Sequence, residues 1–233
     1  MKHKYWRCYS RLSWRGMRTF LIVAVVVVLF NGLCYGVVMN PTPVQQTYLL
    51  HIFGGVYWDV KAIGDTRIML GLYVILYAVI SGIYNIQVGG QIMSAMNYAK
   101  SKSLNAGLLY GGAVLAVMLA VSAAAYLLYQ QFIMTAPVRL EEFLSFLFMA
   151  AGALVMFYGC AAFATAVLLR WGIWFGLAAV AVILGVLLYN MSALWVMIEF
   201  GRAENTAVVA MLGLGVSLTG LSLRFARRLE LKR

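Results

Sequence analysis

The sequence predicts an all-α, polytopic membrane protein with six transmembrane helices and both termini in the cytoplasm. Of its 233 residues, 64% are hydrophobic, whereas soluble domains are about half apolar. The apolar residues form six long runs, each close to the roughly 20 residues needed to cross a bilayer. Fourteen of the 18 Lys and Arg residues fall in four segments that alternate with these runs, and six of the seven Asp and Glu residues fall in the three segments between them. This partition is the positive-inside pattern.

The apolar runs define the expected spans and the division of the chain. An even number of spans keeps both basic termini on the cytoplasmic side of the cell membrane. We expect an amphipathic interfacial helix over residues 1–18, one transmembrane domain over 19–223 and a basic cytoplasmic tail over 224–233. The predicted spans are Thr19–Val38, Ile68–Val88, Ala106–Tyr129, Phe143–Leu168, Ile173–Asn190 and Thr206–Leu223.

The net charge of +11 indicates contact with lipid headgroups rather than with nucleic acid. The basic residues flank the apolar runs, where they face anionic headgroups and fix the topology. Three cysteines, Cys8, Cys34 and Cys160, show neither a disulfide framework nor a metal-binding spacing. The first apolar run is too long for a signal peptide and has no small-residue cleavage site, so we expect it to be retained as a span.

The N-terminal segment has two residue classes that follow one helical period. A basic stripe backed by aromatic and apolar residues is typical of a helix lying flat on the inner leaflet. A plain topology anchor without helical structure is the alternative. The basic stripe consists of Lys4, Arg7, Arg11, Arg15 and Arg18, and the opposite face carries Tyr5, Trp6, Tyr9, Leu12 and Met17.

The connection after the second predicted span, residues 91–105, begins with helix-forming residues and then becomes small, polar and basic around Ala99-Lys100-Ser101-Lys102. Such a segment can extend the second span into the cytoplasm and turn on a short transverse helix. A solvated loop is the alternative.

In layout, the chain resembles the permease subunit of a bacterial type-2 ABC exporter, of the small six-span kind associated with peptide or antimicrobial export. In that family the turn after the second span has the pattern small–Ser–Arg/Lys–aromatic, and it docks on the ATPase as a coupling helix. Ser101-Lys102 matches the Ser–Lys pair, but Leu104 stands where the aromatic is expected. The resemblance implies an ATPase-coupling role for Met96, Asn97, Tyr98, Lys100, Ser101 and Lys102.

The residues that are missing also bear on function. The sequence has no Gly-x-x-x-x-Gly-Lys-Ser/Thr run, so ATP and Mg would be bound by a separate ATPase subunit. No charged residue falls within a predicted span away from its ends, whereas ion-coupled transporters normally titrate such groups. The chain has no His-Glu-x-x-His motif, and Glu141-Glu142 is better explained as marking the outer face than as part of a protease. We therefore expect a transport subunit rather than an enzyme, with no cofactor or metal of its own.

These observations predict a permease for amphipathic or hydrophobic cargo, either peptide or lipid-like. Six spans form half of an alternating-access pathway, so we expect a second copy or a homologue beside this chain, together with ABC ATPase subunits and membrane lipids. The alternatives are a non-catalytic membrane scaffold or assembly factor, and a secondary carrier for neutral hydrophobic solutes.

Small and polar residues within the spans are candidates for helix packing and for a transport path. Gly pairs one helical turn apart let helices approach closely. Polar residues inside spans can line a path or hydrogen-bond to neighbouring helices. The small-residue pairs are Gly32/Gly36, Gly107/Gly111, Gly172/Gly176 and Gly213/Ser217, and the polar residues are Asn31, Asn85, Gln87 and Asn190.

Overall fold

The computed structural model describes residues 66–87, 100–132, 139–189 and 205–228, together with Arg18, Leu21, Ile22, Val25 and Val26. All of the regular structure in these ranges is α-helical, which confirms the all-α prediction for this part of the chain. The predicted interfacial helix before Arg18 and most of the first span lie outside the described residues. The helices are α4 (Thr66–Gln87), α6 (Lys100–Phe132), α7 (Leu140–Trp171), α8 (Ile173–Tyr189) and α10 (Asn205–Arg228).

Each of the five helices corresponds to a predicted span, from the second to the sixth. The largest difference is at the start of α6, which begins at Lys100 rather than Ala106. The residues from Lys100 to Ala106 include neither Gly nor Pro, so nothing in them interrupts a helix that continues into the apolar run. The C-terminal helix α10 also continues past Leu223, so the tail begins as helix through Arg228.

Three helical stretches are long and apolar enough to cross a membrane among the residues described: Leu104–Ala124, Leu140–Trp171 and Val208–Arg227. Two shorter apolar stretches, Val74–Gln87 and Ile173–Ile183, accompany them. In α7, the rise from Glu142 to Arg170 is about 42 Å at about 1.5 Å per residue. That length is close to the thickness of a bilayer with its headgroups, about 40–45 Å. The charged residues of α7 are therefore spaced to lie at the two surfaces.

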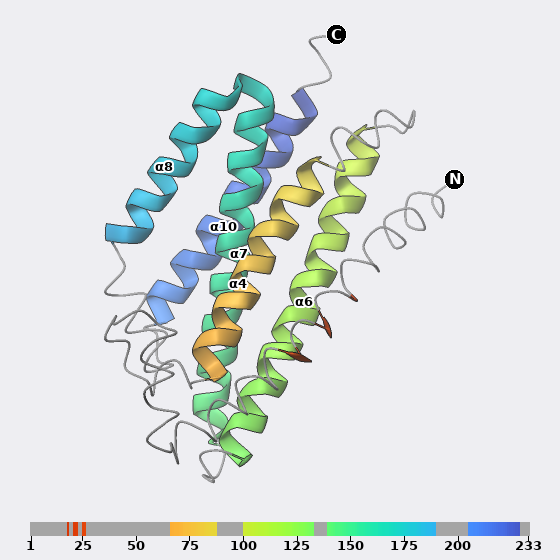
Figure 1. Cartoon of the computed structure of the whole chain (residues 1–233). Helices are drawn as coiled ribbons and strands as arrows, with labels where there is room; N and C mark the ends of the chain where they lie inside the picture. The colour runs from red at the N-terminus through yellow and green to blue at the C-terminus, as the bar shows by residue number, and fades with distance from the viewer. Residues whose placement is uncertain are drawn as a thin grey trace, which may run out of the picture.

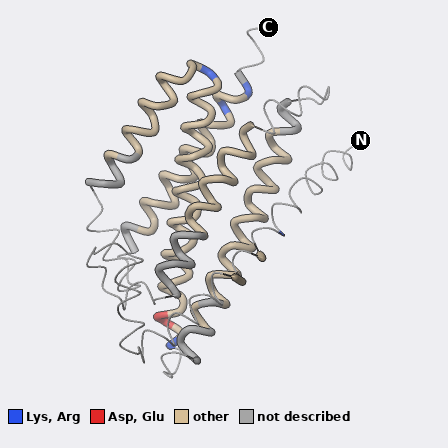
Figure 2. The backbone as a smooth tube through the Cα atoms, viewed as in Figure 1, with Lys and Arg blue, Asp and Glu red and all other residues tan. Residues whose placement is uncertain are grey.

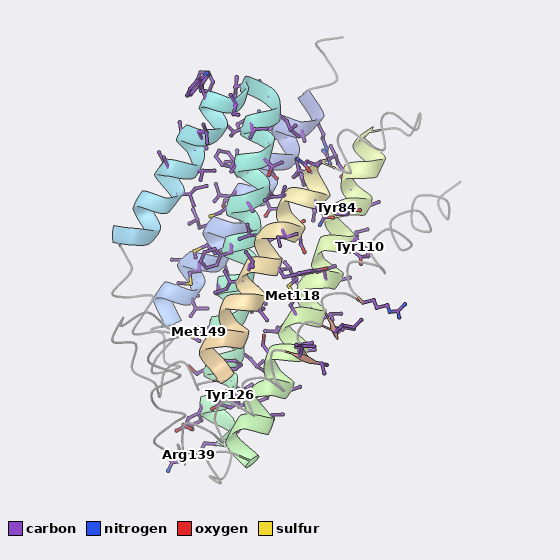
Figure 3. The ribbon with its side chains drawn as sticks, in the orientation of Figure 1. Tyr84, Tyr110, Met118, Tyr126, Arg139 and Met149 are labelled. Carbon is purple, nitrogen blue, oxygen red and sulfur yellow. The ribbon has the colours of Figure 1, made fainter. Side chains whose placement is uncertain are left out.

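The helices form an up-and-down bundle in which consecutive described helices run in opposite directions, and α8 lies to one side (Figure 1). Helix α7 is central, because it packs against α10 and α4 most extensively and also against α8 and α6. The core between α4, α6 and α7 is built from Val74, Ala78, Val114, Met118, Leu154 and Tyr158. Figure 3 shows Met118 of α6 in this core, facing α4.

Glycines let the backbones of these helices approach closely. A methyl group on Gly82 of α4 would lie 2.5 Å from the carbonyl oxygen of Tyr158 on α7. A methyl group on Gly215 of α10 would lie 2.5 Å from the carbonyl oxygen of Val155, also on α7. At Gly159 of α7, a methyl group would collide with the backbone of Gly215. Close backbone approach at small residues is how helices in membranes gain van der Waals contact.

The turn between α7 and α8 consists of Gly172 alone. Its φ of 96° and ψ of 180° place it in a region that only glycine populates readily. The backbone N–H of Gly172 donates to the carbonyl oxygen of Leu168 at 2.9 Å, which closes the last turn of α7. Between Ile173 and Ile183 most side chains of α8 are exposed, with Trp174 80% exposed. Helix α8 therefore packs along α7 and presents most of the apolar surface of this stretch outward.

Candidate functional site

Two features are candidates for function: a basic surface at one end of the bundle and a buried polar cluster beneath it. The basic end gathers the C-termini of α4, α7 and α10 with the N-terminus of α6 (Figure 1). Arg170 lies in the last turn of α7, and Arg224 and Arg227 lie near the end of α10. The opposite end carries the acidic residues of α7, Glu141 and Glu142 (Figure 2).

At the basic end, α10 is tied to α6 by a hydrogen bond between exposed side chains. The guanidinium of Arg227 donates from Nη2 to Oδ1 of Asn105 over 2.6 Å. Asn105 is the last residue of the predicted ATPase-coupling connection, residues 91–105. The bond therefore links that connection directly to the C-terminal helix.

A second cluster ties the ends of α7 and α10 together through aromatic rings. The guanidinium carbon of Arg170 lies 4.6 Å from the ring centre of Trp171 and 5.0 Å from that of Phe225. The Trp171 and Phe225 rings meet edge to face with centroids 5.0 Å apart. Phe163 packs on Phe225 at 5.9 Å. Cation–π contacts of this kind stabilise an arginine beside aromatic surface, so the Trp171 and Phe225 rings hold Arg170 at this end of the bundle.

The structure divides the predicted coupling residues into two groups. Lys100, Ser101 and Lys102 are in the first turn of α6. Met96, Asn97 and Tyr98 lie outside the described residues. Positive charge at a helix N-terminus opposes the helix dipole, which favours acidic groups there. The first turn of α6 has no acidic residue, so the two lysines do not stabilise the start of the helix.

The opposite end of the bundle is closed by different contacts. Tyr126 of α6 stacks on Phe146 of α7 at 4.5 Å and contacts Phe143 at 5.8 Å. Arg139 lies 3.9 Å from Glu142, and both side chains are exposed. Figure 3 shows Tyr126 and Arg139 at this end. Such an exposed ion pair contributes little to stability, so the aromatic stack holds α6 against α7 here.

The buried polar cluster is centred on Asn85 of α4 and Tyr158 of α7. Asn85 donates a hydrogen bond from Nδ2 to the Tyr158 hydroxyl over 3.0 Å, and the two residues are 5% and 6% exposed. Gly111 of α6 leaves the space that this pair occupies, because a methyl group there would collide with the Tyr158 hydroxyl and lie 2.8 Å from Nδ2 of Asn85. Three helices therefore meet around one buried hydrogen bond.

A narrow pocket opens beside this pair, between α4, α6, α7 and α10. The part of the pocket that no side chain fills is no larger than a water molecule. None of the lining residues is charged. They are Asn85, Ile86, Leu104, Gly107, Leu108, Tyr158, Ala162, Thr219, Ser222 and Leu223.

The hydroxyl groups of α10 in this pocket donate to their own helix. Thr219 donates from Oγ1 to the carbonyl oxygen of Gly215 over 2.8 Å, and Ser222 donates from Oγ to the carbonyl oxygen of Thr219 over 2.7 Å. Their hydrogens are therefore used within α10, and their oxygens remain as acceptors toward the pocket.

The sequence indicated some of these residues and missed others. Asn85 and Gly111 stood out as a polar residue and a small residue within spans, and the structure brings them together. Of the predicted small-residue pairs, Gly213 has open space around its backbone, whereas Gly176 meets the side chain of Leu168. Tyr158 gave no signal in the sequence, because an aromatic residue in an apolar run is indistinguishable from core.

The described residues contain no group of three or more His, Cys, Asp or Glu residues arranged to hold a metal ion. Comparison with protein-family models, with curated proteins and with solved structures finds no match to this chain.

Proposed function

We propose that this chain is the transmembrane permease subunit of an ATP-driven ABC exporter. It would have six spans and its basic end in the cytoplasm, and it would move amphipathic or hydrophobic cargo with power from a separate ATPase. The observation that carries the proposal is the distribution of charge over the helices. Arg170, Arg224 and Arg227 lie at one end of the bundle, and no Asp, Glu, Lys, Arg or His falls inside a predicted span, away from its ends, where it could couple transport to an ion gradient.

The contacts at the basic end support a mechanical coupling role for residues 91–105. A motor that pushed on this connection would act on the N-terminus of α6. The Arg227–Asn105 hydrogen bond passes that displacement to α10, and α10 packs extensively on α7. A second copy or a homologue would supply the other half of the pathway.

The test is co-purification from native membranes in mild detergent, followed by mass spectrometry. We expect a polypeptide with a Gly-x-x-x-x-Gly-Lys-Ser/Thr motif to accompany the full-length chain. Changing Tyr98, Lys100 and Lys102 together to Ala should abolish that association. Arg139→Ala, which removes a charge at the opposite end, is the control and should leave it intact. A chain that purifies without any ATPase, or an association that survives the triple change, would refute the proposal.

A further inference from the structure

The Asn85–Tyr158 pocket has unused hydrogen-bonding groups of both kinds. The bond from Asn85 leaves the Tyr158 hydroxyl hydrogen, the second Nδ2 hydrogen and Oδ1 of Asn85 available. No second hydrogen-bond partner reaches either side chain from the parts of the chain that the structure describes. If the amide oxygen and nitrogen of Asn85 are exchanged, the Tyr158 hydroxyl becomes the donor of this bond. The pair then still has both donor and acceptor groups available. The pocket is therefore suited to a group that both donates and accepts.

The chemistry of the lining excludes charged ligands from this pocket. The lining has no cationic side chain to bind a phosphate or carboxylate, and it has no carboxylate to bind an ammonium or a metal ion. Burying an unpaired charge there would be very costly. Thr219 and Ser222 add acceptors only, and Ser222 is fully buried. A neutral hydroxyl both donates and accepts and is no larger than a water molecule, so it fits the space and the hydrogen-bonding pattern.

The pocket also lies beside apolar surface on which an alkyl chain could pack. The lining residues of α6 and α10 face one another across the pocket, although these two helices otherwise touch only slightly. Leu108 is 36% exposed at this seam, so the pocket lies next to apolar surface.

We propose that the pocket binds the terminal hydroxyl of a neutral amphipathic molecule, hydrogen-bonded to Asn85 and Tyr158, with its alkyl chain in the seam between α6 and α10. This inference rests on the proposed transport function, since it names the chemical class of the cargo. A hydroxyl satisfies the unused donor and acceptor groups that the bundle otherwise leaves buried.

Photolabelling of the purified full-length chain tests this binding without the ATPase. The probe is an eight-carbon alcohol that carries a diazirine, and the control is the same diazirine alkane without the hydroxyl. Mass spectrometry should map the alcohol to residues 104–108 and 219–223. We expect labelling by the alcohol to exceed labelling by the alkane by about threefold to twentyfold, the range that one or two buried hydrogen bonds in a membrane protein provide.

Two variants make the test specific to the polar pair. Tyr158→Phe keeps the ring but removes the hydroxyl, so it should reduce alcohol labelling to the level of the alkane. Ser122→Ala removes a buried hydroxyl of α6 that donates to the Met118 carbonyl outside this pocket, and it should leave labelling unchanged. Asn85→Leu provides an independent variant if Tyr158→Phe does not elute as a folded protein.

Equal labelling by the alcohol and the alkane would overturn the inference, and so would labelling that persists in both pocket variants. Either result with an ATPase that still co-purifies would show that the cargo class is wrong while the transport function stands. Specific labelling of a chain that binds no ATPase would support the hydroxyl site but refute the proposed ATPase partner.

Discussion

Gly159 of α7 and Gly215 of α10 bring the backbones of their helices into direct contact, because neither position has room for a methyl group. The α7–α10 interface is the most extensive between any two described helices. Its closest point therefore depends on two residues that carry no side chain. This relationship fixes how the C-terminal helix lies in the bundle.

Replacing Gly215 with Ala should destabilise the protein. The new methyl group would lie 2.5 Å from the Val155 carbonyl oxygen, which is backbone and can move only if the helices separate. Overpacking of this kind costs about 1–3 kcal/mol. Thermal unfolding in detergent should show a lower midpoint for Gly215→Ala. Gly213→Ala, two residues away with open space around it, is the matched control. Equal midpoints for the two variants would contradict the close contact.

Gly172→Ala should also lower the unfolding midpoint, but through the backbone. A residue with a side chain is strained at a φ of 96° and a ψ of 180°, by about 1–3 kcal/mol. Space is not the cause, because no atom lies within 4 Å of the added methyl position. Gly185→Ala is the control, since Gly185 lies inside α8 with similar open space. There, Ala should be neutral or slightly stabilising because it is the better helix former. A Gly172→Ala protein as stable as the parent would argue against this turn.

The sequence predicted the helices well and their contacts poorly. Apolar runs bounded by charge determine where helices can lie, so the ranges of α4, α7, α8 and α10 followed within a few residues. The start of α6 was not predicted. The basic and polar residues there suggested a loop, although they include no Gly or Pro that would interrupt a helix. Close contacts depend on which glycine faces which helix. Gly159 and Gly215 belong to none of the small-residue pairs that spacing alone selects, and their opposition exists only once α7 and α10 cross.

The hydrogen bond between Asn85 and Tyr158 should show measurable coupling in a double-mutant cycle. Asn85→Leu and Tyr158→Phe each leave the partner buried without its hydrogen bond, whereas the double variant removes both groups. We expect the double variant to be less destabilised than the sum of the single variants, by about 0.6–1.7 kcal/mol. The measurement is the free energy of unfolding in mixed micelles. Strict additivity would mean that the bond of 3.0 Å contributes nothing to stability.

The last prediction concerns which side of the membrane each end of the bundle faces. Glu142 lies in the first turn of α7 and Arg228 ends α10 at the opposite end of the bundle. The reagent is a membrane-impermeant maleimide, applied to cells whose outer envelope it can pass but whose cytoplasmic membrane is intact. If the basic end faces the cytoplasm, the maleimide should label Glu142→Cys in these cells. It should label Arg228→Cys only after the cytoplasmic membrane is permeabilised. Both single-cysteine variants are made in a background in which Cys8, Cys34 and Cys160 are replaced by Ser or Ala.

The cysteine-free parent, which should remain unlabelled throughout, controls for background reaction in this experiment. The reversed pattern would place the basic end outside, against the tendency of Lys and Arg to remain on the cytoplasmic side. It would also remove the surface on which a cytoplasmic ATPase could act. Labelling of both sites in intact cells would mean that α7 and α10 do not each cross the membrane once, as their lengths and apolar composition allow.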